Sequence, residues 1–236
     1  MNVNSNTSDE TDETPLIVAC CDGNLRTICE LMENESLDVN VTDICGRTPL
    51  YFVCTKNHFH VVEKLVYHPH IDVNRTSGRS ILASLLYSAM MNHIESVQEL
   101  LKHPNIDVNV HEQFGEPPIF FGSMYGHYRV VRELLKHDKI DVNKKRICGR
   151  AALHVTSGKG HLKVVRELLS SNRLDVNDIN ADNDTALSMA SLCNRVLLFV
   201  SSQITRILMS TTLMVWVRQP CFMHVTRIIS TLFVSS

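Results

Sequence analysis

The sequence lacks the short motifs that accompany the common catalytic chemistries. It contains no G-x-x-x-x-G-K-[ST] phosphate loop, no G-x-G-x-x-G, no H-E-x-x-H, no G-x-S-x-G and no protein-kinase signature. The stretch GSMYG at 122 resembles a nucleophile turn but has the wrong spacing. We therefore expect no catalytic residue and no cofactor. Without a Cys or carboxylate cluster at ligand spacing, we expect no metal site either.

Signs of secretion are also missing. The first 13 residues are polar and acidic, and they contain neither the basic nor the apolar region of a signal peptide. None of the 8 cysteines forms a C-x-x-C pair. We expect free thiols in a reducing compartment, an intracellular location in cytoplasm or nucleus, and a disordered segment over residues 1–13.

The last part of the chain has no acidic residue. After Asp184 there is no Asp or Glu, and the only charges are four arginines: Arg195, Arg206, Arg218 and Arg227. Residues 192–236 are open to three interpretations. They could be a membrane anchor over 196–217, although Arg206 would lie at its middle. They could instead be an apolar helix that caps the rest or docks a partner, or a foreign end from a mispredicted exon or truncated gene model.

The remainder of the sequence is repetitive. The segment L/I-D-V-N begins at 37, 71, 106, 140 and 174, so its spacings are 34, 35, 34 and 34. A second marker, TPLIVACCDGN at 14, recurs as TPLYFVCTKNH at 48 and AALHVTSGKGH at 151. A third, VVRELL at 130 and 164, lies between the other two. Three markers in one period indicate an array of stacked repeats.

Each marker has a local physical role. Thr14 and Thr48 can cap a first helix, and a proline follows each of them at a position that needs no N–H bond. Nine positions later only Gly or Asn occurs, and both accept the left-handed conformation that ends a helix. The pattern Val130, Val131, Leu134 predicts a second, amphipathic helix. The Asp and Asn of the D-V-N segment are typical of turns.

The loop that leads into each new repeat also has a recurring residue at a fixed distance from the next capping site. A residue that tolerates positive φ stands two positions before the capping site, at Gly46, Gly115, Gly149 and Asn183. The third repeat departs from this rule, because its loop RTSGRSIL has an extra residue and displaces Gly78. We expect a distorted loop there.

These residues resemble the ankyrin repeat, whose T-P-L-H-x-A pattern is matched by TPLIVA, TPLYFV and AALHVT. The resemblance covers residues 14–191, with repeats starting near 14, 48, 83, 117 and 151 and a partial sixth at 185. It implies an all-α fold, a solenoid of helix-turn-helix units from which β-hairpin-like fingers project on the concave side. It also implies that the histidines after the first helices are structural ties.

The resemblance further implies a non-catalytic scaffold or adaptor that is monomeric and binds another protein. Alternatively, the chain is a membrane-associated ankyrin protein or a fragment of a larger multidomain protein. Family interaction surfaces use the loop fingers and the last exposed residues of the first helix. Carried over by position, the candidate residues are Asp22, Ile44, Arg47, Lys56, Met90, Met91, Gln113, Phe114, Glu116, Met124, Tyr125, Ile147, Arg150 and Lys159.

One finger is also basic, because it contains Lys144, Lys145 and Arg146 beside Arg150. These side chains could be simply solvated, or they could attract an acidic protein partner. Nucleic acid is not expected as a partner, because that would need a wider basic face. The chain carries –2 overall, and its arginine-only end contributes +4, so the repeats and their leader carry –6.

Overall fold

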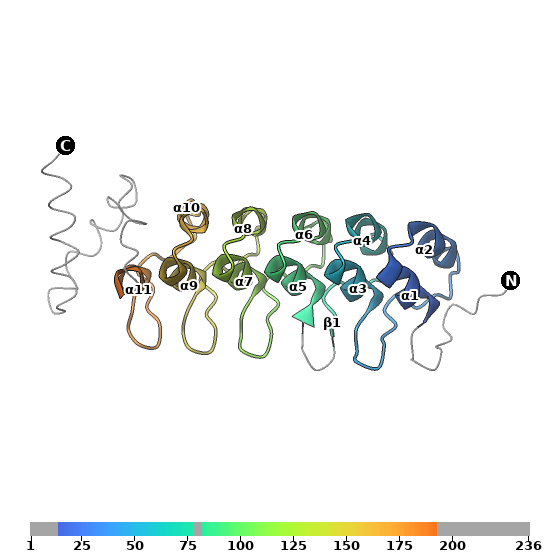
Figure 1. The fold of residues 1–236 in the computed structure, drawn as a ribbon, viewed down its shortest axis with the longest axis horizontal. Helices are drawn as coiled ribbons and strands as arrows, with labels where there is room; N and C mark the ends of the chain where they lie inside the picture. The colour runs from blue at the N-terminus through green and yellow to red at the C-terminus, as the bar shows by residue number, and fades with distance from the viewer. Residues whose placement is uncertain (1–13, 78–81, 193–236) are drawn as a thin grey trace, which may run out of the picture.

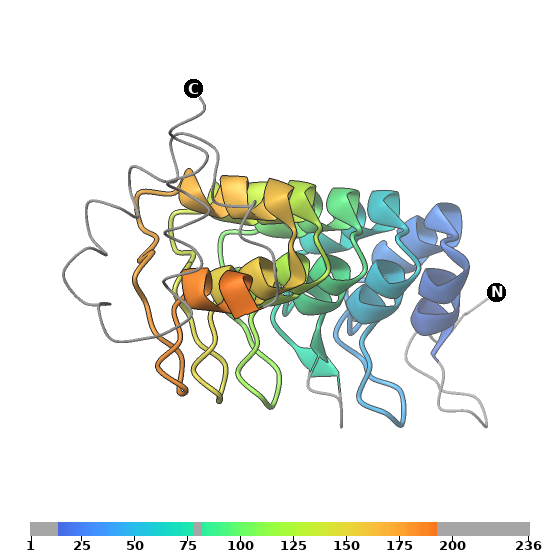
Figure 2. The ribbon, with the colours of Figure 1, turned by 60° about the vertical axis from the view of Figure 1, so that its left-hand side comes forward.

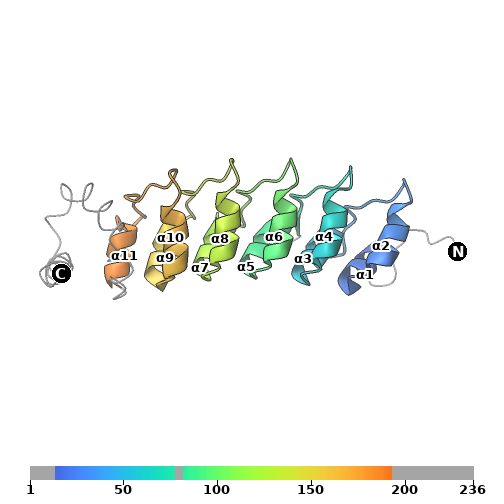
Figure 3. The same ribbon diagram turned by 90° about the horizontal axis from the view of Figure 1, so that it is seen from above.

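Six inner and five outer helices form two parallel rows in the residues that the computed structural model describes, 14–77 and 82–192 (Figure 1). The inner helices are α1 (Pro15–Asp22), α3 (Pro49–Thr55), α5 (Ser84–Met90), α7 (Pro118–Met124), α9 (Ala152–Lys159) and α11 (Ala186–Leu192). The outer helices are α2 (Leu25–Met32), α4 (Phe59–Val66), α6 (Ile94–Leu101), α8 (Tyr128–Leu135) and α10 (Leu162–Leu169). Each pair packs against the next along one direction (Figure 3). The fold is the expected all-α solenoid of stacked helix pairs.

The ends of the inner helices follow from the sequence. The Thr14 hydroxyl accepts the N–H of Ile17 at 3.4 Å, and the Thr48 hydroxyl accepts the N–H of Tyr51 at 3.1 Å. Each of the first five inner helices is followed by a residue with φ between 58° and 84°, which confirms the predicted stops. These residues are Gly23, Asn57, Asn92, Gly126 and Gly160.

The core lies between the rows. The paired valines of the outer helices, such as Val130 and Val131 in α8, are fully buried, as is Leu134 one turn later. Burying one such side chain contributes about 1.5–3 kcal/mol, and most of that burial depends on the neighbouring repeat. One continuous apolar cluster therefore runs from Leu16 to Ala190.

The fingers project from the inner row at a steep angle to the helices, so each repeat is L-shaped (Figure 2). Gly46, Gly115, Gly149 and Asn183 all have positive φ, as predicted. The finger of the third repeat differs, because it has a short antiparallel ladder between β1 (Thr76–Ser77) and β2 (Leu82–Ala83). Its tip, residues 78–81 with Gly78, lies outside the described residues.

Two predicted segments also lie outside the described residues, namely the N-terminal residues 1–13 and the tail from 193 onward. The anchor interpretation of 196–217 falls in the second of them. Within residues 14–77 and 82–192, no helix is long and apolar enough to cross a membrane.

Candidate protein-interaction surface

The predicted interaction residues occupy two kinds of place. Some lie in the fingers and some at the C-terminal ends of the inner helices, and we refer to these as the finger residues and the helix-end residues. The large hydrophobic residues among them that are exposed are Ile44 and Ile147 at 76%, Phe114 at 49%, and Met91 and Tyr125 at 48%. Asp22, Lys56, Gln113, Lys145 and Lys159 are also exposed. Arg47, Met90, Met124, Lys144, Arg146 and Arg150 are half-buried.

Glu116 is the exception, and the expectation that it faces solvent is wrong. Its side chain is buried, and its carboxylate lies 2.9 Å from the guanidinium of Arg146 in the next finger. Burial raises the pKa of Glu116, and the neighbouring Glu112 adds to this effect, while Arg146 opposes it. Glu116 therefore joins two fingers rather than presenting a charge to a partner.

The cations of the basic finger make contacts within the chain. Lys144 Nζ donates to the carbonyl oxygen of Asn109 at 2.7 Å, and Lys145 Nζ donates to that of Ile179 at 2.9 Å. Lys145 also pairs with Asp178, and Arg150 lies 3.7 Å from Asp182. These cations mainly connect their finger to its neighbours.

A buried acceptor at the base of each of three fingers was not identified from the sequence. Asp43 Oδ1 accepts the N–H groups of Cys45 at 2.9 Å and Arg47 at 2.8 Å. Glu112 and Asn180 do the same in their own fingers. The sequence signal that could have identified these acceptors is their common position, four residues before Arg47, Glu116 and Asp184.

The bonds that Asp43 accepts affect the pKa of its carboxyl group. Burial alone would raise its pKa, but hydrogen bonds from the Arg47 side chain and backbone, with the charge of that residue, outweigh burial and lower it. The Arg47 guanidinium also lies 4.7 Å above the ring of Phe52. Arg47 is thus held against its own finger.

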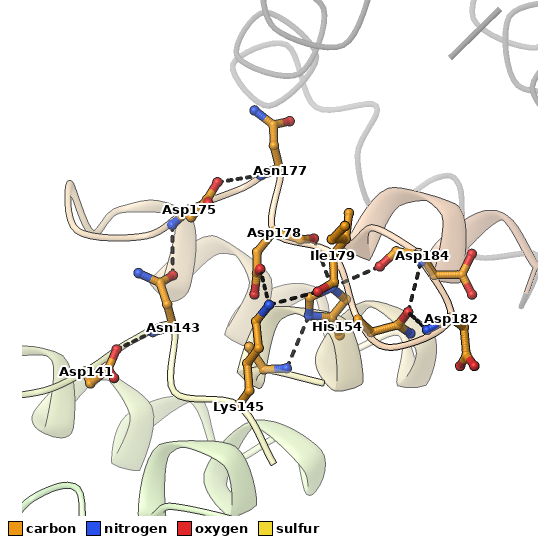
Figure 4. Close-up of polar contacts among 12 residues, drawn as sticks. Asp141, Asn143, Lys145, His154, Asp175, Asn177, Asp178, Ile179, Asp182 and Asp184 are labelled. Atoms are coloured by element: carbon orange, nitrogen blue, oxygen red, sulfur yellow. Dashed lines mark hydrogen bonds and ion pairs between the residues drawn. The ribbon is translucent and has the colours of Figure 1, made fainter. Parts of the chain in front are cut away.

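The D-V-N segments hold neighbouring repeats together through their asparagines. As predicted, each Asp accepts the N–H two residues on, for example Asn143 N–H to Asp141 at 3.0 Å. In the first four segments, the Asn side chain then bonds to the next repeat. Asn143 accepts the Asp175 N–H at 2.8 Å (Figure 4). It also donates to the carbonyl oxygen of Arg173 at 2.8 Å. The same pair of bonds is made by Asn40, Asn74 and Asn109.

Histidines fix the ends of the inner helices in a similar way. His127 Nε2 lies 3.1 Å from the carbonyl oxygen of Met90, and His161 Nε2 lies 3.1 Å from that of Met124. His58 and His93 make the equivalent contacts to the carbonyl oxygens of Cys21 and Cys54. The backbone of Met90 and Met124, two of the helix-end residues, is therefore attached to the next repeat.

His154, in the T-P-L-H position, is buried beneath the last described finger. Its Nδ1 accepts the Ala151 N–H at 3.2 Å, and its Nε2 lies 3.0 Å and 3.2 Å from the carbonyl oxygens of Asp178 and Asp184 (Figure 4). This arrangement requires a neutral ring with the proton on Nε2. Burial lowers the pKa of His154, against the influence of Asp178.

Comparisons with known proteins agree with this geometry. A search of curated proteins finds no match. The crystal structure of EF0377, described as an ankyrin repeat protein, superposes with a TM-score of 0.72 at 21% identity, covering 78% of this chain and 95% of that one. The sequence matches the family described as "Ankyrin repeats (3 copies)" over residues 1–77 and 123–211, which is more than half of the chain. The chain therefore belongs to the ankyrin-repeat family.

Proposed function

We propose that this protein is a non-catalytic scaffold that binds a partner protein through its finger residues and helix-end residues. The observation that supports this most is where apolar surface is left uncovered. In the described part of the chain, nine large hydrophobic side chains are exposed, and five of them belong to this set. These five are Ile44, Met91, Phe114, Tyr125 and Ile147.

Exposed aromatic, Met and Ile side chains on a rigid frame suit the central anchors of an interface. Burying such a side chain against a partner removes apolar area from water at about 25 cal/mol per Å². The frame reduces the entropy that binding must cost, because the histidines hold the helix ends and the buried acceptors hold the fingers. Tyr125 is further restrained, because its ring stacks on His127 with centroids 5.9 Å apart.

Charged residues border this apolar set. Lys56 and Lys159 are exposed at the inner-helix ends on either side of the repeats that contain Met91 and Tyr125. Asp22 occupies the matching slot of the first repeat and is exposed as well. We propose that the partner is a single protein bound by the monomer, and that these charges select its orientation more than they add affinity.

The test is an alanine pair at the apolar anchors. A protein captured from cell extract by the full chain is identified and its affinity measured, and then Phe114→Ala combined with Tyr125→Ala is compared with the parent. Loss of two anchors should weaken binding by about tenfold or more. The helical circular dichroism should stay the same, because both side chains are about half exposed.

The matched control is Tyr67→Ala. Tyr67 is an aromatic residue that is 66% exposed, but it follows the outer helix α4 and belongs to neither set. We expect the control to bind as tightly as the parent. Equal loss in both variants, or none in the double variant, would show that the partner binds elsewhere.

A further inference from the structure

At the C-terminal edge of the array, the valine of the D-V-N segment is less covered than in every earlier repeat. The valine of the D-V-N segment is at most 2% exposed in the first four repeats, as in Val108 and Val142. In the fifth repeat Val176 is only half-buried. Leu174 is half-buried too, as is Ile71 at its position in the second repeat, whereas Leu37, Ile106 and Ile140 are buried. The last D-V-N segment lacks the neighbour that covers the others.

The asparagine bonds also stop at this edge. Four asparagines use both their amide oxygen and their amide nitrogen to bind the backbone of the following repeat. Asn177 occupies the fifth position and makes no side-chain hydrogen bond within residues 14–77 and 82–192. Its amide is exposed and points away from the cluster around Asp175 (Figure 4). One donor and one acceptor are therefore available to a further segment of backbone.

The outer helix α10 presents the third part of this edge. Every earlier outer helix packs against the one that follows it, but α11 is the last helix of the described residues. Leu162 and Leu169 of α10 are half-buried at the margin of the core, as are Tyr128 and Leu135 at the same positions of α8, but no later outer helix of the described residues follows α10. Arg132 of α8 forms an ion pair with Glu167 of α10, while Arg166, at the same position as Arg132, has no ion pair in the described chain.

We propose that residues 193–236 of the same chain bind this C-terminal edge, formed by Leu162, Leu169, Leu174, Val176 and Asn177. The segment begins immediately after α11, which packs against α9, so it is tethered beside the edge. A short tether gives an effective concentration of the order of millimolar. No other chain has this advantage.

The chemistry of the segment fits the edge. It contains the apolar runs VLLFV, ILM, LMVWV and LFV, which suit the half-buried leucines and Val176. Its backbone can supply the N–H and C=O groups that Asn177 lacks. It has no acidic residue, so it offers no carboxylate to Arg166, and apolar burial must provide most of the binding energy.

The only tryptophan of the protein, Trp216, lies in this segment and reports on it in the full-length chain. We expect Trp216 to emit at shorter wavelength than in the urea-unfolded protein and to be protected from acrylamide. Leu162→Glu should shift the emission to longer wavelength and increase quenching. Leu25→Glu is the matched control, because Leu25 holds the same repeat position at the opposite edge and is 37% exposed. It should leave both signals unchanged.

Asn177→Lys provides a second variant in case Leu162→Glu loses its helical signal, because Asn177 is exposed and its change cannot disturb the core. It should also increase quenching of Trp216. The proposal is overturned if Trp216 is as accessible in the parent as in urea. It is equally overturned if neither edge variant changes the signal, or if Leu25→Glu changes it as much. None of these measurements depends on the protein partner of the finger residues.

Discussion

At the scale of single residues, the asparagine of the D-V-N segment has the widest effect. Its side chain carries an amide group like that of the backbone. The amide nitrogen donates a hydrogen bond to the backbone of the next repeat, and the amide oxygen accepts one from it. Asn109 donates to the carbonyl oxygen of Lys139 at 2.7 Å and accepts the Asp141 N–H at 2.8 Å. Repetition of this contact fixes the spacing between repeats where each chain segment enters its finger.

Replacing Asn109 with alanine should therefore destabilise the protein. Two backbone groups of the next repeat lose their partners, and a net cost of about 1–3 kcal/mol in the free energy of unfolding follows. Urea unfolding followed by circular dichroism measures it. Asn172→Ala is the control at an exposed asparagine, and it should change the free energy by less than about 0.5 kcal/mol. Equal effects at the two sites would refute the structural role of Asn109.

Buried and half-buried histidines make the free energy of unfolding depend on pH in a definite direction. The pKa values of His68, His127 and His154 are lowered, in each case mainly by burial. The unfolded chain binds protons at an ordinary histidine pKa of about 6.5, while the folded chain does so only at lower pH. The stabilising contribution is complete above about pH 6.5 and is lost as the pH falls from there toward the folded-state pKa.

The urea midpoint should accordingly fall between pH 7.5 and pH 5.5, a range above the titration of ordinary carboxylates. In the His154→Gln variant the urea midpoint should fall less over this range than in the parent, because the most buried of the three imidazoles is absent. A midpoint that is constant or rises toward pH 5.5 would contradict the neutral, hydrogen-bonded state of these rings.

At the scale of elements, the turn between inner and outer helix decides how repeats dock. Gly126 ends α7 with φ +78°, and a Cβ there would lie 2.8 Å from the His161 ring. Alanine would therefore be strained and would displace the histidine that holds Met124. Gly158, inside α9, has no such constraint, and alanine has the higher helix propensity there.

The two glycines should therefore respond in opposite directions. Gly126→Ala is expected to lower the free energy of unfolding by more than about 1 kcal/mol. Gly158→Ala should leave it unchanged or raise it by up to about 1 kcal/mol. Thermal unfolding of the two variants side by side checks this. A stable Gly126→Ala protein would mean that the left-handed turn and the close histidine are not needed.

The same scale shows what the sequence could and could not predict. The helix caps at Thr14 and Thr48 depend on a few neighbouring residues, as do the helix ends at Gly and Asn. Their periodic recurrence in the sequence was therefore sufficient to predict them. The cross-repeat bonds of Asn109 depend on how two repeats stack, which no local pattern describes. Glu116 occupies the slot of Arg47 and Arg150, and only the position of Arg146 in the next finger explains why it is buried.

At the scale of the whole molecule, the contacts that hold the repeats together involve other residues than the exposed side chains proposed to bind a partner. The asparagine and histidine contacts run along the stack and restrain its backbone, while the exposed finger residues and helix-end residues vary from repeat to repeat. Because each repeat contacts only its neighbours, a change in one exposed slot should not alter the others. Such an arrangement can present one composite surface to a protein without any catalytic group.

Site-specific photo-crosslinking tests this account most directly. A photoreactive phenylalanine analogue is placed at Phe114 in one version of the full chain and at Tyr67 in another, and both are irradiated with the captured partner. We predict a covalent partner adduct from position 114 and none from position 67. An adduct from position 67 with none from position 114 would mean that the outer helices, and not the fingers and inner-helix ends, form the binding surface.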